Sequence, residues 1–335
     1  MRLSLNSLVA PGAFRMALAG AVFLHHTTIF NIGMSAVLVF FVLSGYWVAR
    51  MWTHDYVNTI APYYTYLISR IWRVIPVFAL ASVFSWGLLL WREGRPNSIG
   101  SLTHQIFSNI LILGYNSLPF QANVPGWSLD IEIQFYVIAP LVIFLISRSI
   151  YALFLFVLIS FFSNSFGGAA SLAPFLYFFG IGISSALLEI TPTPQQAYLA
   201  LIAAATVMLV CLLIAIYNNT LAEYTPIQLV FSHKINLLLA VIMTPWALYT
   251  VRQPSNLFDR MLGDLSYIFY LLHWSILGIM KTGEGSYFFR LVNCLLALLI
   301  ITALSYLIWR FYDHPINQLR AKWVKRRLRN NSLQV

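Results

Sequence analysis

Arg15 and His26 are the first two residues of the sequence whose types and spacing could do chemistry. They lie eleven residues apart within one apolar stretch. On an α-helix this spacing returns both side chains to within about 20° of the same face, about 16 Å apart along the axis. Such a face would present a guanidinium at one end and an imidazole, which can act as a general base, at the other.

The neighbouring His25 lies about 100° away on the same helix, so we expect only His26 to share the face of Arg15. The alternative for His26 is a histidine at the membrane interface without a catalytic role, and the alternative for Arg15 is an anchor on the cytoplasmic side. Adjacent histidines diverge on a helix, and no convergent Cys, Asp or Glu pattern accompanies them. We therefore expect no metal site.

Arg70 and Arg73 form a second candidate site. Residues at positions i and i+3 share a helix face, and two guanidinium groups there could bind phosphate bidentately. Arg50 could join them. The alternative is anchoring on the cytoplasmic side, which the spacing taken alone favours.

A third group surrounds two carboxylates, Asp130 and Glu132, which follow Trp127 and precede Tyr136. Asp130 suits a position near a helix N-terminus, where a negative charge complements the helix dipole. Glu132 lies deeper in the helix. We expect it at the depth of His26, where a carboxylate can orient an imidazole and raise its basicity.

Two further polar positions interrupt apolar runs. Ser44 and Gly45 form a small pair in mid-span, as close helix packing requires, and Ser44 is expected too far below His26 to serve as the nucleophile. His273 is a second candidate for a polar interior, because ionisable residues inside a span usually mark function. Its alternative is a histidine satisfied by a neighbouring Tyr or Ser.

The composition identifies the kind of protein that must position these residues. Of the 335 residues, 60% are hydrophobic and 9% are charged, whereas soluble domains are roughly 25% charged. This excludes a soluble globular enzyme and a disordered, collagen-like or disulfide-rich chain. The net charge of +10 is expected to reflect membrane topology rather than binding to nucleic acid. Cys211 and Cys294 lie in apolar runs and are expected to be small buried residues.

The apolar runs predict an all-α fold, that of a polytopic integral membrane protein with about ten transmembrane helices. The expected spans centre on Phe14–Phe30, Met34–Trp52, Arg73–Trp91, Glu132–Ser147, Ile150–Phe162, Leu172–Leu188, Tyr198–Ile216, Ile235–Val251, Ser266–Met280 and Phe289–Trp309.

The charge distribution predicts the topology. With the N-terminus inside, 15 of the 20 Lys and Arg residues fall on or near the inner side, Arg2 and Arg329 among them, and five fall outside: Arg92, Arg95, Lys234, Lys281 and Arg290. This bias places both termini in the cytoplasm. The basic tail Lys322–Arg329 is then expected to contact anionic lipid rather than nucleic acid. The amphipathic segment Ser101–Leu113 is expected on the outer membrane surface, and the loop Tyr217–His233 is a second outer region that could meet an acceptor.

Five blocks, in order and across most of the chain, resemble the acyltransferase 3 family of bacterial membrane acyltransferases. They are Arg15, Ala19, Val22 and His26, similar to that family's Arg…Ala…Val…His signature; Phe40–Gly45, similar to FFxLSG; Arg70, Arg73 and Pro76, similar to RxxR…P; Trp127–Tyr136, similar to WSLxxExxFY; and Ser266–His273, similar to SYxxYLxH. The chain departs from the family at Ala10–Met16, where Leu-Asp-Gly-Leu-Arg-Gly is usual. It departs again at Asp313, where Glu is more usual and His314 intervenes before Pro315.

The resemblance implies a donor, most often acetyl-CoA, that enters from the cytoplasm, and an acceptor hydroxyl on an envelope glycan or a small molecule. The protein would lie in the inner membrane of a bacterium, and residues 1–335 would form a single transmembrane acyltransferase domain without a fused soluble domain. Arg70 and Arg73 would bind the CoA phosphates, and Arg15 would line the inlet. His26 would act as the base or carry the acyl group, and Glu132 would orient it. Further candidate substrate-binding residues are Trp127, Ser128, Asp130, Tyr136 and His273.

A different class of protein, a transporter or exporter of a glycan or small molecule, also fits many spans with buried ionisable residues. It predicts a repeat-built architecture with helices broken at the midplane, and the sequence contains no repeat that supports it. A structural membrane subunit is a third alternative, which leaves the buried His26 unexplained. The oligomeric state, including a homo-oligomer, remains open.

Overall fold

The structure, a computed structural model, describes residues 10–28, 30–94, 100–163, 170–217, 232–280, 282 and 286–328. Within these ranges it consists of helices and connecting segments without a β-strand. Arg2, Arg95, Lys281 and Arg329 of the charge count lie outside the described residues, as does most of the predicted outer loop Tyr217–His233.

The longer helices are α1 (Pro11–Thr27), α2 (Gly33–His54), α3 (Pro62–Glu93), α5 (Gly126–Arg148), α8 (Pro194–Tyr217), α10 (His233–Thr250), α11 (Leu257–Ile279) and α12 (Tyr287–Ile308). The shorter ones are η2 (Tyr56–Asn58), α4 (Leu102–Leu111), η3 (Tyr115–Ser117), α6 (Tyr151–Phe161), η6 (Ala173–Phe175), α7 (Leu176–Leu187), η7 (Trp309–Asp313) and α13 (His314–Arg326).

Each of the ten predicted apolar stretches falls mainly on one helix of its own. Six of the described helices, α2, α3, α5, α8, α11 and α12, are long and apolar enough to cross a membrane. The other four, α1, α6, α7 and α10, have 17, 11, 12 and 18 residues and are not among these six. The all-helical, multi-pass character is therefore confirmed, whereas length and composition support six spans rather than the expected ten.

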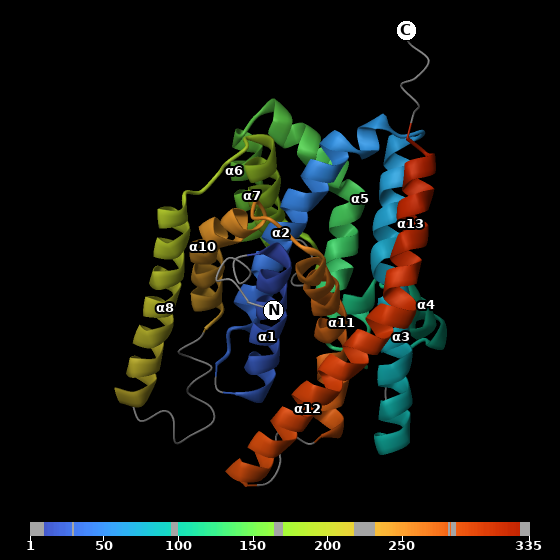
Figure 1. Cartoon of the computed structure of the whole chain (residues 1–335), viewed down its shortest axis with the longest axis vertical. Helices are drawn as coiled ribbons and strands as arrows, with labels where there is room; N and C mark the ends of the chain where they lie inside the picture. The colour runs from blue at the N-terminus through green and yellow to red at the C-terminus, as the bar shows by residue number, and fades with distance from the viewer. Residues whose placement is uncertain are drawn as a thin grey trace.

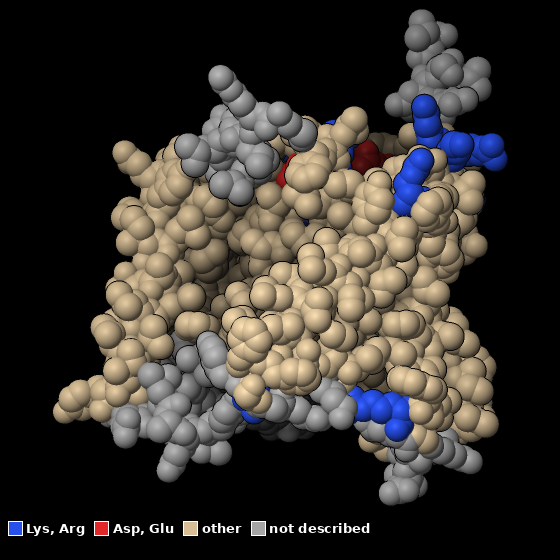
Figure 2. Space-filling view, turned by 60° about the horizontal axis from the view of Figure 1, so that its bottom comes forward, with Lys and Arg blue, Asp and Glu red and all other residues tan. Residues whose placement is uncertain are grey.

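The helices form a central group and a periphery (Figure 1). The apolar windows of α2, α5 and α11 are mostly buried, whereas those of α3, α8 and α12 are buried to a third or less. Apolar side chains that face outward need an apolar solvent, which a bilayer provides. Figure 2 shows the same property as a wide band without Lys, Arg, Asp or Glu between basic residues at the upper and lower edges of the molecule.

Glycines at two crossings bring helix backbones together. A Cβ atom on Gly45 of α2 would lie 2.2 Å from the carbonyl oxygen of Phe179, and one on Gly182 of α7 would lie 2.0 Å from that of Val42. On α1, a Cβ atom on Gly12 would lie 1.8 Å from the carbonyl oxygen of Asp259 on α11. The prediction that Gly45 serves close packing is thus confirmed, and the Gly12 crossing fixes α1 against α11.

The start of α1 is held by α11 as well. Pro11 occupies the first turn, where its missing N–H costs nothing. No residue of α1 caps its own N-terminus; instead the carboxylate of Asp259 accepts a hydrogen bond from the Ala13 N–H at 2.8 Å. Asp259 also accepts from the hydroxyl of Ser255 at 2.5 Å. These contacts set the depth of Arg15 one turn further along.

The predicted surface segment Ser101–Leu113 contains the helix α4. Its polar residues Gln105, Ser108 and Asn109 are buried against the protein, while Leu102, Phe107 and other apolar residues are exposed. This inverted amphipathicity suits a helix that turns its apolar face to lipid.

Between α12 and α13 the chain forms a π-helical segment, Trp309–Asp313. An extra residue in a helical turn re-aims the side chains that follow it. Here it turns Asp313 inward, where 1% of the residue is exposed. The helix α13 then packs along α3 (Figure 1).

Candidate active site

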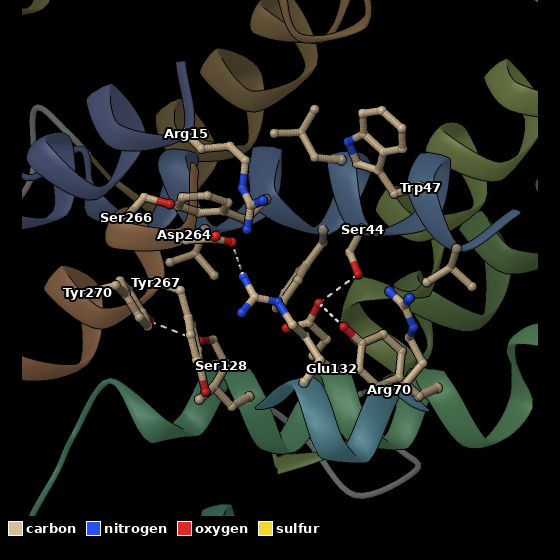
Figure 3. Close-up of a pocket in the computed structure, with 18 of the residues that line it drawn as sticks. Arg15, Ser44, Trp47, Arg70, Ser128, Glu132, Asp264, Ser266, Tyr267 and Tyr270 are labelled. Atoms are coloured by element: carbon tan, nitrogen blue, oxygen red, sulfur yellow. Dashed lines mark hydrogen bonds and ion pairs between the residues drawn. The ribbon is translucent and has the colours of Figure 1, made fainter. Parts of the chain in front are cut away.

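A cavity of about 350 Å³ lies among α1, α2, α3, α5, α11 and α13. Figure 3 shows side chains from several of these helices pointing into it. In the described part of the chain its polar and charged lining consists of Arg15, Ser44, Arg70, Arg73, Ser128, Glu132, Tyr136, Asp264, Ser266, Tyr267, Tyr270 and Arg320. Four arginines and two carboxylates therefore face one space.

Glu132 lines the cavity and accepts hydrogen bonds from two hydroxyl groups. Its Oε1 accepts from the Ser44 hydroxyl at 2.7 Å and from the Tyr136 hydroxyl at 2.7 Å, as Figure 3 shows for Ser44. The expectation that Glu132 lies at the depth of His26 and orients it is therefore wrong in this structure. The reason is that α5 begins at Gly126, so Glu132 lies almost two turns inside the helix, beside mid-span Ser44.

Arg73 is paired with two carboxylates. Its guanidinium lies 2.7 Å from Asp264 Oδ1 on α11 and 3.2 Å from Asp313 Oδ1 at the end of the π-helical segment. Asn317 on α13 also donates to Asp313, at 2.8 Å. Arg73 thus joins α3, α11 and α13, and most of its charge is compensated by the protein itself.

Arg15 and Arg70 line the same cavity without a carboxylate partner in the described part of the chain. Arg70 is 8% exposed. It donates to the hydroxyl of Tyr56 at 2.9 Å and contacts the sulfur of Met51 at 3.2 Å, while its Nε has no partner. Among the described residues the cavity thus has more cations than carboxylates, and two of its arginines have no ion-pair partner, which favours a negatively charged ligand.

His26 belongs to a separate aromatic cluster at the other end of α1. Its ring stacks on His273 at 5.3 Å between centroids and meets the Trp274 ring edge-on at 5.1 Å. Arg15 lies against Gly263 of the same helix α11, which confirms that the two residues share a face of α1. His25 instead packs on Gly33, as its expected divergence requires.

The hydrogen bond of His273 fixes the chemical form of its ring. The Nδ1 atom lies 2.6 Å from the carbonyl oxygen of Tyr270, so it carries the proton and donates it. The Nε2 atom is buried and has no hydrogen-bond partner in the described part of the chain. The bond to Tyr270 thus fixes the orientation in which the His273 ring stacks on His26.

Aromatic side chains separate the cavity from this histidine cluster. The Tyr270 ring lines the cavity and lies 5.8 Å from the His273 ring and 6.5 Å from the Phe40 ring. The Tyr270 hydroxyl is 2.9 Å from the Ser128 hydroxyl and donates to the Pro125 carbonyl oxygen at 3.2 Å. This pair of hydroxyl groups holds the Tyr270 ring, which forms the wall between the cavity and the histidine cluster.

The predicted site residues therefore fall into two groups. Arg15, Arg70, Arg73, Glu132, Ser128 and Tyr136 line the cavity, whereas His26, His273, Trp127 and Asp130 do not. Asp130 is buried and bonded on both oxygens, to the Asn116 N–H at 2.8 Å and to the Gln134 amide at 3.2 Å, so it holds the turn before α5. Trp127 packs on Phe41.

The predicted site residues do not include six polar or charged residues that line the cavity: Ser44, Asp264, Ser266, Tyr267, Tyr270 and Arg320. The sequence predicts packing alone for Ser44, and it predicts no contact in the cavity for Asp264 or Arg320. Their roles depend on contacts between distant helices, for which the sequence offers no spacing signal; only the mid-span polar character of Ser44 could have indicated it. No group of three His, Cys, Asp or Glu side chains that could hold a metal ion occurs in the ranges the structure describes.

The comparison with protein families agrees with this arrangement. Residues 10–310 match the family model Acyl_transf_3, described as an acyltransferase domain. No curated protein and no solved structure matches the chain significantly. The matched range contains both ends of α1, the arginine pair on α3, Glu132 and the His273 segment, and leaves out α13. Because the match covers nearly the whole chain, this multi-pass helical protein belongs to the Acyl_transf_3 family of acyltransferases.

Proposed function

We propose that this membrane acyltransferase moves an acyl group, in the first place acetyl, from acyl-CoA in the cytoplasm to a hydroxyl group of a glycan or small molecule outside the inner membrane of a bacterium. The observation that carries the donor assignment is the cavity with two arginines, Arg15 and Arg70, that have no carboxylate partner. Phosphate groups suit guanidinium forks in charge and in geometry.

The path of the donor would follow α1. CoA is long and thin, with its phosphates at one end and its thioester at the other. With the phosphates on the arginine side of the cavity, the pantetheine arm would run toward the Phe40 and Tyr270 rings. Arg15 and His26 lie about 16 Å apart along α1, a distance such an arm can span. A rearrangement of the two rings would then admit the thioester to His26.

At His26 the reaction would proceed by general base catalysis. The imidazole takes the proton of the acceptor hydroxyl, and the hydroxyl oxygen attacks the thioester carbonyl carbon. A C–O bond forms, the C–S bond breaks, and the CoA thiolate takes the proton back from the imidazolium. In the covalent variant, an imidazole nitrogen attacks the thioester carbonyl carbon and the C–S bond breaks with release of the CoA thiolate. The acceptor hydroxyl then attacks the acyl-imidazole, a C–O bond forms, the C–N bond breaks, and the thiolate takes the hydroxyl proton. His273, whose ring stacks on that of His26, would hold the His26 imidazole in position for either route.

Donor binding can be tested without knowledge of the acceptor. Isothermal titration of acetyl-CoA into detergent-purified protein is expected to show binding in the micromolar range, and Arg70→Ala is expected to weaken it. Arg310→Ala, which changes an exposed arginine of the π-helical segment, is the matched control and should bind like wild type. Absence of binding to wild type, or equal binding by wild type and Arg70→Ala, would contradict the donor assignment.

A further inference from the structure

Four arginines line the cavity, and they differ in whether a carboxylate pairs with them. Arg73 has Asp264 and Asp313 as partners. Arg15, Arg70 and Arg320 have no carboxylate partner among the described residues. Arg73 was expected to form the phosphate-binding pair with Arg70, yet its donors are already taken up by two carboxylates.

Arg320, in contrast, is joined to Arg70 through neutral groups. Arg70 donates to the Tyr56 hydroxyl at 2.9 Å, and Tyr56 donates to the Ser69 hydroxyl at 2.8 Å. Arg320 also donates to Ser69, at 2.9 Å. This relay holds two guanidinium groups at one end of the cavity and adds no negative charge to offset theirs.

The π-helical segment explains how Arg320 reaches the cavity. Asp313, Asn317 and Arg320 are spaced by four and three residues, so they lie on one face of α13. Asn317 donates to Asp313 at 2.8 Å, and its amide oxygen accepts from Arg320 Nε at 3.3 Å. The ion pair between Asp313 and Arg73 thus turns this face toward α3, and Arg320 with it.

Arg70 is buried and Arg320 is half-buried, and neither has a carboxylate partner in the part of the chain that the structure describes. Such charges are unfavourable unless a ligand supplies the negative charge. Arg70 retains an unpartnered Nε–H while 8% of the residue is exposed. A phosphate or diphosphate group would accept from both guanidinium groups and offset both charges. The range that matches the family model ends at residue 310, so α13 adds a cation beyond the matched region.

We infer that Arg320 is a phosphate-binding residue that acts as the partner of Arg70 and binds the diphosphate or phosphate end of the donor; this inference rests on the proposed function. In this arrangement the ion pair between Arg73 and Asp313 positions α13. The donor site is then complete only when α13 is docked on α3.

The test compares two donors that share a thioester and differ in phosphate. Acetyl-CoA and S-acetylpantetheine, which lacks the nucleotide and its phosphates, are titrated into the full-length protein in detergent. Arg320→Ala is expected to weaken acetyl-CoA binding about ten- to a hundredfold, the loss of a charge-assisted contact, and to leave S-acetylpantetheine binding unchanged. Arg320→Lys should lie between. Lys322→Ala, an exposed cation on the same helix, is the matched control.

If the proposed function is wrong, wild type itself does not bind acetyl-CoA. If wild type does bind it, three other outcomes would overturn the inference about Arg320. Equal affinity of wild type and Arg320→Ala for acetyl-CoA would remove Arg320 from the site. Equal loss for both donors would show a structural role. Arg320→Ala could also bind acetyl-CoA like wild type but no longer gain thermal stability from added phosphatidylglycerol. That result would assign Arg320 to a lipid phosphate instead.

Discussion

Glu132 is the residue on which the charge balance of the cavity depends most directly. It accepts hydrogen bonds from Ser44 and Tyr136 and faces a space lined by Arg15 and Arg73. In the proposed function this carboxylate would set the charge near the donor rather than contact His26. Loss of the negative charge makes the cavity more positive, so a variant that lacks it should still bind an anionic donor.

Glu132→Gln is therefore expected to lower the acyl-transfer turnover at least tenfold without raising the KM for acetyl-CoA. The amide oxygen can still accept from the Ser44 hydroxyl, so the fold should persist. Steady-state kinetics of CoA release in the presence of the acceptor measure both constants. A higher KM with unchanged turnover would instead place Glu132 in donor binding.

The hydroxyl groups of Tyr270 and Ser128 are expected to stabilise each other's position beside the cavity. Because the two groups bond each other at 2.9 Å, Tyr270→Phe and Ser128→Ala should each destabilise the protein by about 0.5–1.5 kcal/mol. The double variant should lose less than the sum, since both changes remove the same bond. Thermal unfolding of the four proteins in detergent measures this coupling, and strict additivity would show that the pair does not hold the wall.

The sequence predicted positions on a helix face better than contacts between helices. The spacing of Arg15 and His26 predicted their shared helix face, and both residues lie against α11. The partner of Glu132 was predicted wrongly, because helix entry depth depends on where the preceding turn ends. Arg320 was missed because only the packing of α13 on α3 brings it to the cavity.

The helices that hold the site cross at glycines, and replacement of these glycines by alanine is expected to lower the stability of the protein. Gly45→Ala and Gly182→Ala would each place a methyl group within 2.2 Å of a backbone carbonyl oxygen on the facing helix. Backbone cannot give way as a side chain can, so we expect each to destabilise the protein by about 1–3 kcal/mol or more.

Gly87→Ala is the matched control, since a Cβ atom there meets nothing within 4 Å. Alanine favours a helix over glycine by up to about 1 kcal/mol, so this variant should be neutral or slightly more stable. Thermal unfolding of detergent-purified variants separates the two cases. Equal midpoints for all three would contradict the close crossing of α2 and α7.

The junction of α12 and α13 depends on Asp313. Asp313→Ala leaves Arg73 with only the half-buried Asp264, and loss of a hydrogen bond between charged groups typically costs about 1.5–3 kcal/mol. Exposed Arg310 in the same segment is the control, and Arg310→Ala should change stability by no more than about 0.5 kcal/mol. A loss for Asp313→Ala no larger than for the control would show that the pair does not anchor α13.

The elements themselves were largely predictable. Each apolar run became a helix, since a backbone in lipid must satisfy its own hydrogen bonds. The lengths of α6 and α7 and the π-helical turn at Trp309–Asp313 were not predictable, because periodicity gives neither helix ends nor a single extra residue in a turn.

For the whole molecule, the bias of Lys and Arg predicts that both termini face the cytoplasm. In a Cys211→Ser, Cys294→Ser background, Lys325→Cys on α13 should react with a membrane-impermeant maleimide only after the cells are permeabilised. Thr103→Cys on α4 should react in intact cells. Both positions are exposed in the structure. The reverse labelling pattern would invert the topology and place the arginine end of the cavity outside.

In the proposed mechanism the protein transfers an acyl group to an envelope or secreted acceptor by way of His26. The most direct test is NMR spectroscopy and mass spectrometry of O-acyl groups on the glycans of a deletion strain, complemented with wild type or with His26→Ala at equal membrane expression. Our account predicts an acyl mark with wild type and a loss of at least a hundredfold with His26→Ala, as expected when a general base is removed. Full restoration of the mark by His26→Ala would show that His26 is structural and would contradict the mechanism.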